Sequence, residues 1–142
     1  MKASDIKVGN IYYVDFEPSR KKEFNGHHMA LVLKKNIDEI TFIVIPMTSN
    51  KDGIGKNKIS LGVIESLPER LKADNHESYA VYDQVRTINA SRFSNIISDK
   101  GEIMEATLDK DKLTMVYKAI IKNLIYDLDD KIKDTLKQDC FE

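Results

Sequence analysis

The chain has 142 residues, of which 42% are hydrophobic and 32% are charged, a composition typical of one globular domain that buries its own core. Its only cysteine, Cys140, excludes a disulfide framework within the chain and fits a reducing cytosol. A net charge of −1 argues against binding nucleic acid through bulk positive charge, and no apolar run is long enough for a signal peptide or a membrane span. We therefore expect a cytoplasmic protein with no membrane partner.

Five segments rich in β-branched and aromatic residues predict strands. They are Asn10–Phe16, Met29–Leu33, Ile40–Pro46, Lys58–Leu61 and Ser78–Ile88. Two polar loops that contain lysines, Glu17–Gly26 and Asn50–Asn57, separate the early strands. Further along, Ser66–Leu71 predicts a helical turn, and Ser91–Ile97 predicts the end of the sheet.

The spacing of apolar residues changes toward the C-terminus, where they recur at intervals of three and four. This pattern predicts a helix from about Asp111 to Leu136, with Asp109 or Asp111 as its cap. Residues 126–142 are predicted as a helical or frayed acidic tail, and no linker or repeat divides residues 1–142 into more than one domain. Strands first and a helix last predict an α+β fold built on a small, strongly bent sheet.

The predicted strand Ser78–Ile88 contains charged and polar residues, which are unusual in a strand so rich in tyrosine and valine. Asp83, Gln84 and Arg86 lie among tyrosines and valines. Burying a charge is costly unless the charge is paired. These side chains are therefore expected either to pair with each other or to line a site.

Other polar residues lie at the ends of two predicted strands. His27 and His28 open one strand, and Thr48 and Ser49 close the next. If these strands and that of Arg86 are neighbours, the side chains converge on one groove beside the basic loops. Histidine exchanges protons near neutral pH, arginine binds phosphate through two hydrogen bonds, and RNA supplies its own 2′-OH nucleophile. The set suits phosphodiester chemistry, and the sequence has no metal-ligand spacing and no phosphate-binding loop.

Four groups of residues, in a fixed order, carry a family resemblance. They are Gly9-Asn10-Ile11-Tyr12 with Asp15 and Pro18; Glu23 and Gly26 with Ala30-Leu31-Val32-Leu33; Pro46-Met47-Thr48-Ser49; and Tyr79 with Asp83-Gln84-Val85-Arg86-Thr87-Ile88 and Arg92. With these groups, the chain resembles the PemK/MazF family of type II toxin–antitoxin ribonucleases over roughly Val8–Asn123. The resemblance implies a small SH3-like antiparallel β-barrel with a long C-terminal helix, assembled as a homodimer.

The resemblance also implies an activity and partners. Family members cleave single-stranded RNA at short sequences without a metal, and they leave 2′,3′-cyclic phosphate and 5′-OH ends. The implied partners are the RNA substrate and a cognate antitoxin protein, and no cofactor is implied.

Individual residues acquire roles through the same resemblance. Thr48 stands where the family has a serine or threonine that contacts the scissile phosphate, and Arg86 belongs to the signature strand. Many members have an arginine with an acid–base role, followed by proline, where this chain has His28 and Met29. The predicted catalytic residues are His28, Thr48 and Arg86. The predicted substrate-binding residues are Glu23, His27, Ser49, Lys56, Lys58, Asp83 and Gln84.

The histidine at position 28 leaves three interpretations open. His28 replaces the family arginine as acid or base, or His27 and His28 bind RNA while Arg86 is central to catalysis, or the site is inactive. Asp83 and Arg86 also have a purely structural interpretation as a mutual pair. Two other functions stay open as well: a non-enzymatic toxin that acts on gyrase through its terminal helix, and a barrel that binds RNA without cutting it.

Overall fold

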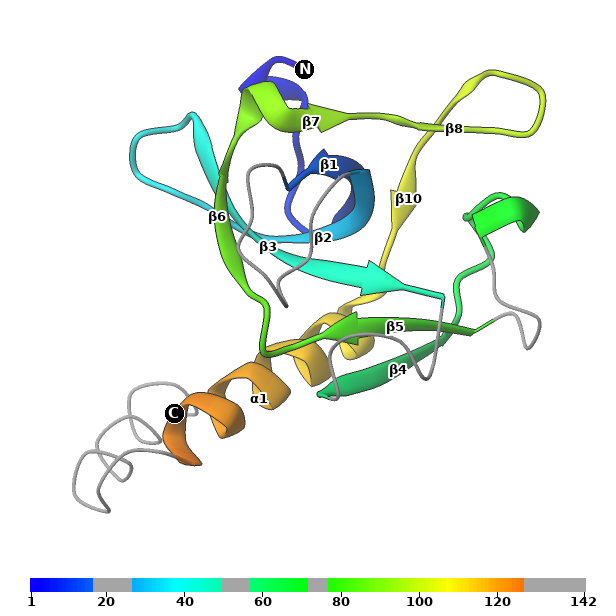
Figure 1. Ribbon diagram of the computed structural model, residues 1–142. Helices are drawn as coiled ribbons and strands as arrows, with labels where there is room; N and C mark the ends of the chain where they lie inside the picture. Colours follow the sequence, from blue (N-terminus) through cyan, green and yellow to red (C-terminus); the bar gives the residue numbers. More distant parts are fainter. Residues whose placement is uncertain (17–26, 50–56, 72–76, 127–142) are drawn as a thin grey trace.

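The computed structural model describes residues 1–16, 27–49, 57–71 and 77–126 (Figure 1). Within these ranges, ten strands and three short 3₁₀ turns precede one C-terminal helix. The strands are β1 (Asn10–Asp15), β2 (His27–Lys35), β3 (Thr41–Thr48), β4 (Lys58–Val63), β5 (Glu77–Val81), β6 (Arg86–Asn89), β7 (Phe93–Ser94), β8 (Ile96–Ile97), β9 (Ile103–Met104) and β10 (Ala106–Thr107). The turns are η1 (Ala3–Asp5), η2 (Glu69–Leu71) and η3 (Ala90–Arg92), and the helix is α1 (Lys110–Tyr126).

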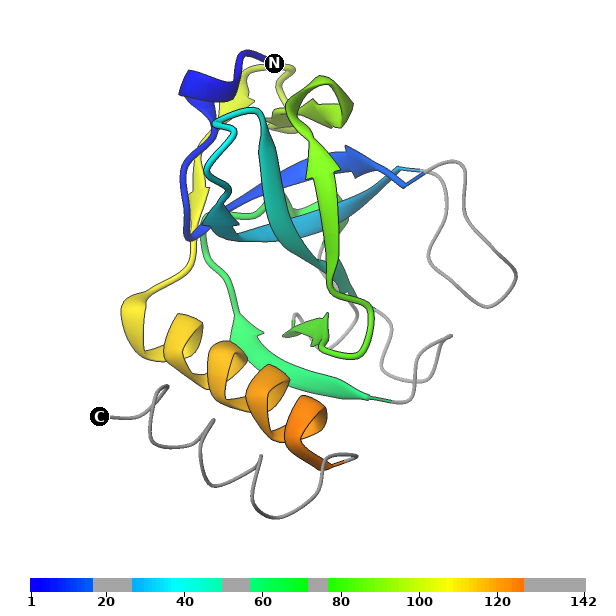
Figure 2. The ribbon, with the colours of Figure 1, turned by 90° about the vertical axis from the view of Figure 1, so that its left-hand side faces the viewer.

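Antiparallel pairing joins most strands into one sheet in the order β10–β1–β2–β3–β5–β4. Strand β6 also pairs with β3, β7 pairs with β1, and β8 and β9 form a separate two-stranded ribbon. The sheet is strongly bent, and α1 crosses beneath it alongside β4 (Figure 2). A mostly antiparallel sheet with a C-terminal helix confirms the predicted fold class.

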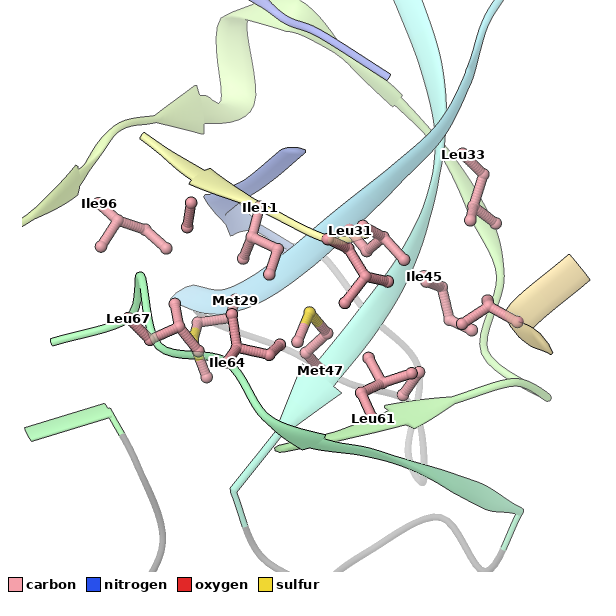
Figure 3. Close-up of a cluster of buried hydrophobic side chains, with 14 residues drawn as sticks. Ile11, Met29, Leu31, Leu33, Ile45, Met47, Leu61, Ile64, Leu67 and Ile96 are labelled. Atoms are coloured by element: carbon pink, nitrogen blue, oxygen red, sulfur yellow. The ribbon is translucent and has the colours of Figure 1, made fainter. Parts of the chain in front are cut away.

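Strand β2 is covered on both faces. Met29–Leu33 is buried at every position. Met29, Leu31 and Leu33 belong to a cluster that extends to Val116 of α1, which we call the first cluster (Figure 3). The intervening Ala30 and Val32 belong to a second cluster on the opposite face. An uninterrupted apolar run is the pattern expected of a strand without a solvent-facing side.

The other early strands are confirmed, with different ends. Strand β1 ends one residue earlier than predicted, at Asp15. Strands β2, β3 and β4 run past their predicted ends, to Lys35, Thr48 and Val63. The predicted helical turn is present as the shorter η2.

The prediction of one continuous strand over Ser78–Ile88 is wrong. The segment divides into β5 and β6, with the turn Tyr82–Val85 between them. Both strands pair with the same side of β3. Strand β5 pairs with Met47 and Thr48, and β6 pairs with the four residues from Thr41 to Val44. Asp83 and Gln84 therefore lie in a turn, and Arg86 begins a new strand.

Proline explains where this break occurs. Between the pairs Met47–Ala80 and Val44–Arg86, the two β3 residues Ile45 and Pro46 face five residues of the other segment. Proline has no N–H and cannot donate to a neighbouring strand. The neighbouring segment thus leaves the sheet where β3 lacks a donor.

The sheet does not end at Ile97 as predicted, because β10 returns to pair with β1. Asn10, only 4% exposed, anchors this edge. Its Nδ2 donates to Glu105 Oε1 at 3.1 Å, and its Oδ1 accepts from Thr107 Oγ1 at 2.9 Å. Lys7 Nζ lies 3.2 Å from the same Glu105 oxygen. A buried amide thus ties the last strand to the first.

Helix α1 begins at Lys110, next to the predicted start at Asp111. The backbone N–H of Lys112 donates to Asp109 Oδ1 at 2.9 Å, so Asp109 is the cap. The predicted continuation of the helix past Tyr126 and the acidic tail lie outside the described residues. Among the described helices, none is both long and apolar enough to cross a membrane.

Contacts along one side of α1 hold it to the sheet. Val116 is fully buried in the first cluster. One residue later, the hydroxyl of Tyr117 donates to the backbone oxygen of Leu33 at 2.6 Å, and burial raises the pKa of this phenol. The helix is therefore attached to β2 by both packing and a hydrogen bond.

We predict that Asn10→Ala lowers the free energy of unfolding by about 1–3 kcal/mol, because it removes the two hydrogen bonds that the buried amide makes to Glu105 and Thr107, each of which contributes about 0.5–1.5 kcal/mol. Urea denaturation measures the change. Lys7→Gln is the matched control, since it removes only an exposed ion pair to the same Glu105 and should lower the free energy of unfolding much less than Asn10→Ala does. Equal losses in the two variants would contradict the anchoring role of Asn10.

The titration of Glu105 gives a second test of this edge. The hydrogen bond from Asn10, followed by the hydrogen bond and charge of Lys7, holds the pKa of Glu105 below its ordinary 4.5. A lowered folded-state pKa stabilises the fold above the unfolded-state pKa, and this stabilisation is lost as pH falls through the folded-state value. In an NMR titration, we expect the Glu105 midpoint below 4.5 in the wild type and higher in Asn10→Ala. A wild-type midpoint at or above 4.5 would refute this assignment.

Candidate active site

The strands that carry the predicted site residues are neighbours. Strand β3 lies between β2 on one side and β6 on the other. Strand β2 begins at His27 and β3 ends at Thr48. Because the two strands are antiparallel, these termini lie at the same end of the sheet. The condition on which the predicted groove depended is therefore met.

His28, Thr48 and Arg86 share one face of the sheet. Arg86 pairs with Val44, His28 pairs with Val14, and both valines belong to the second cluster. Residues paired across antiparallel strands place their side chains on the same face. Thr48 follows Val44 by four positions in β3, so alternation returns it to that face. All three residues are half-buried at the margin of the cluster.

The ring of Phe16 contacts both His28 and Arg86. Phe16 is 1% exposed, and its ring centroid lies 6.3 Å from that of His28 with the planes tilted by 47°. The Cζ atom of Arg86 lies over the same ring, 5.3 Å from its centroid. A guanidinium in this position is attracted by the negative face of the ring. One buried aromatic side chain thus supports a cation and an imidazole together.

The turn Tyr82–Val85 contributes a polar contact to the site. Arg86 Nη2 donates to Gln84 Oε1 at 3.3 Å. The preceding Asp83 is exposed and accepts from Asn57 Nδ2 at 3.0 Å. Gln84 therefore orients the guanidinium, whereas Asp83 fastens the turn to the residue before β4.

A row of polar groups continues from Thr48 toward β4. Thr48 pairs with Tyr79 of β5, and Tyr79 pairs with Ser60 of β4, so the three share a face. The Tyr79 hydroxyl donates to Glu77 Oε2 at 2.9 Å, and Ser60 Oγ lies 3.5 Å from the same oxygen. These groups extend the polar face beyond the predicted catalytic residues.

The two histidines separate in the fold. His27 is exposed and pairs with Asp15, whereas the half-buried His28 pairs with Val14. Neighbours in a strand point to opposite faces. The structure thus places His28, and not His27, with Arg86.

The remaining predicted substrate-binding residues have varied positions. Ser49 follows β3 directly and is half-buried. Lys58 opens β4, where it pairs with Val81 at the end of β5. Glu23 and Lys56 lie outside the described residues.

Sequence reasoning did not identify Phe16 as part of the site. A signal was nevertheless present, because Phe16 continues the alternation of Tyr12 and Val14 in β1, and all three are buried in the second cluster. What the pattern lacked was the position of Arg86, which only the pairing of β6 with β3 provides.

The arrangement has a definite chemical capacity. Arg86 supplies a guanidinium that binds phosphate through two hydrogen bonds, and Thr48 supplies a hydroxyl. His28 supplies an imidazole, a group that exchanges protons near neutral pH. In the described part of the chain, no group of three His, Cys, Asp or Glu side chains is placed to hold a metal ion. The face thus gathers the kinds of side chain that phosphodiester chemistry uses.

Solved structures share this architecture. MazF of Deinococcus radiodurans has a TM-score of 0.57 and 22% identity, with coverage of 84% of this chain and 96% of its own. Mycobacterium tuberculosis toxin MazF-mt6 has a TM-score of 0.54 and 15% identity, with 84% and 98% covered. An endoribonuclease from a mycobacterial species has a TM-score of 0.50 and 13% identity, with 82% and 88% covered. At these identities the likeness shows the fold alone.

The sequence comparison is more specific. None of the curated proteins compared with the chain matches it. A family profile described as "PemK-like, MazF-like toxin of type II toxin-antitoxin system" matches residues 7–124, which include every described strand and most of α1. The chain therefore belongs to the family of PemK-like, MazF-like toxins of type II toxin–antitoxin systems.

Proposed function

We propose that this toxin is a sequence-specific endoribonuclease that cleaves single-stranded RNA without a metal. The observation that carries the proposal is the common face of His28, Thr48 and Arg86, with the Phe16 ring in contact with two of them. Membership of the toxin family and the fold shared with a mycobacterial endoribonuclease support it.

The proposed reaction uses the substrate's own nucleophile. The 2′-oxygen attacks the adjacent phosphorus, its proton is removed, and the bond to the 5′-oxygen breaks as that oxygen gains a proton. The products are a 2′,3′-cyclic phosphate and a 5′-OH. The reaction adds negative charge to the phosphoryl oxygens in the transition state, so a fixed cation beside them lowers the barrier.

Each residue has a proposed part in this reaction. Arg86 binds the scissile phosphate and offsets the developing charge, with Gln84 and Phe16 holding its guanidinium. Thr48 donates its hydroxyl to a phosphate oxygen. His28 performs one of the two proton transfers, in place of the arginine typical of the family. On this proposal, His28 takes over the role of the family arginine and the site remains catalytically active.

The remaining predicted residues are proposed to contact RNA away from the scissile bond. Ser49 and Lys58 flank the polar row on β3, β5 and β4, and Asp83 lies in the turn beside Gln84. His27, exposed on the other face, is proposed to meet RNA that passes around the strand end. Glu23 and Lys56 are proposed contacts from the two basic loops.

Partners follow from the family. We propose that a cognate antitoxin protein inhibits the chain, which the description of the family as one half of a toxin–antitoxin system supports. We also propose that the chain forms a homodimer.

We expect the purified protein to cleave a long single-stranded RNA in the presence of EDTA, because the proposed chemistry needs no metal. Primer extension maps the cut sites, and end analysis should find 2′,3′-cyclic phosphates. Loss of cleavage in EDTA would overturn the metal-free mechanism. Inhibition of DNA supercoiling without RNA cleavage would favour the gyrase-directed alternative, and binding without cleavage would favour a silent RNA-binding protein.

Substitution of the site residues tests their assignment. Arg86→Ala should lower the cleavage rate by about 10²-fold or more, since it removes a preorganised charge. His28→Ala should lower it by at least about 10²-fold, the usual share of a proton-transfer group. Lys35→Gln, an exposed change at the far end of β2, is the control and should cleave normally. Circular dichroism and thermal unfolding establish that the variants fold.

The Arg86→Lys variant refines this test. Lysine keeps the charge but loses both the bidentate hydrogen bonds and the flat contact with the Phe16 ring. Its cleavage rate should lie well below the wild-type rate. Wild-type rates in both His28→Ala and Arg86→Ala would show that the active site lies elsewhere.

A further inference from the structure

A second concave feature adjoins the candidate active site on the side of the helix. Two neighbouring cavities, of about 370 and 270 Å³, share Tyr82 and Asn123 as lining residues. One opens against Lys58 at the start of β4, and the other against the turn Tyr82–Val85. Figure 1 shows the bend between β5 and β6 beside α1, and residues of this bend and of α1 line both cavities. We call this pair of cavities the Tyr82 hollow.

The wall of the hollow is held in place by Asn57. The backbone N–H of Tyr82 donates to the backbone oxygen of Asn57 at 3.0 Å, and Asn57 Nδ2 donates to Asp83 Oδ2 at 3.0 Å. The Tyr82 hydroxyl lies 3.5 Å from Asn57 Oδ1. The tyrosine ring is therefore fixed before any ligand arrives, which lowers the entropy cost of binding to it.

The lining of the hollow combines an aromatic ring, apolar side chains and two cations. The half-buried Tyr82 ring lies near Ile120 and Ala119 of α1. Lys58 and Lys122 approach from β4 and α1. A ring with apolar neighbours suits a nucleobase, and lysines at its margin suit a phosphate. Among biological ligands, a nucleotide unites these two requirements.

The hollow and the candidate active site share one short turn. Gln84 of this turn contacts Arg86, while Tyr82 and Asp83 of the same turn line the hollow. An RNA strand with its phosphate at Arg86 would therefore reach Tyr82 by following this turn from the candidate active site to the side of α1.

We propose that the Tyr82 hollow binds a nucleotide that flanks the scissile phosphate of single-stranded RNA. Its base stacks on Tyr82, and its phosphate lies between Lys58 and Lys122. The identity of the ligand as RNA rests on the proposed function, whereas the hollow itself rests on its own residues.

Chemical-shift mapping by NMR tests the subsite without relying on activity. The probe is a pool of mixed-sequence RNA hexanucleotides with 2′-O-methyl riboses, which lack the attacking hydroxyl. We expect backbone amide shifts at Tyr82, Asp83 and Lys122 as well as at Thr48 and Arg86. Inorganic phosphate at the same concentration is the control and should leave Tyr82 unmoved.

The outcomes separate the subsite from the proposed function. Shifts at Thr48 and Arg86 without any at Tyr82 and Lys122 would overturn the subsite and leave the nuclease proposal intact. Shifts at Tyr82, together with no cleavage of the matching unmodified RNA pool by the wild-type protein, would support the subsite and overturn the nuclease. Equal shifts from phosphate would reduce the hollow to an anion site, and shifts only from an acidic peptide would make it a protein-binding site; both results overturn the proposal.

Two variants give the quantitative test by fluorescence anisotropy with the same RNA. Tyr82→Leu should weaken binding by about 5-fold or more, the lower range for loss of one base–aromatic stack. Lys122→Gln should reduce the slope of log K against log salt by about 0.7, as expected for one phosphate contact on a single strand. Lys118→Gln, an exposed charge on α1 that does not line the hollow, is the matched control and should leave the slope unchanged. Equal slopes for Lys122→Gln and Lys118→Gln would refute the phosphate contact.

Discussion

Burial of β2 on both faces is the constraint on which the rest of this structure depends. Its side chains enter two separate clusters, so β1 and β3 must flank it in one register, and other elements must cover each face. Helix α1 closes one face through Val116, while Phe42, Ile88 and Phe93 close the other. A one-residue slip would exchange the two sets of side chains. The same register fixes His28 and Thr48 at one end of the sheet.

The site lies where this packing stops. Phe16 directly follows β1, and it is buried while its ring contacts a histidine on one strand and an arginine on another. A cation held against an apolar ring at the margin of a core is partly desolvated, and its interaction with a phosphate is therefore stronger than in open water. Phe16 therefore belongs both to the second cluster and to the candidate active site, so the packing of the core directly supports the site.

The turn that lines the Tyr82 hollow forms beside Pro46. The strand beside it cannot continue its ladder there, and Tyr82–Val85 leave the sheet as a bend between β5 and β6. Asn57 donates a hydrogen bond to Asp83 of this bend, and Gln84 of the same bend accepts one from Arg86. A single missing N–H thus produces a turn with one side toward the candidate site and the other toward the helix.

The sequence by itself determined the type of the early strands and of the helix, because apolar spacing and β-branched content depend only on neighbours along the chain. It also pointed to His28 and Thr48 through their places at strand ends, to Arg86 through its place within a predicted strand, and to all three through a family resemblance. Only the tertiary structure decided that Ser78–Ile88 breaks, that β10 returns to Asn10, and that Phe16 supports the site. Each of these depends on residues far apart in the chain that meet across the sheet, and local pattern carries no information about such pairings.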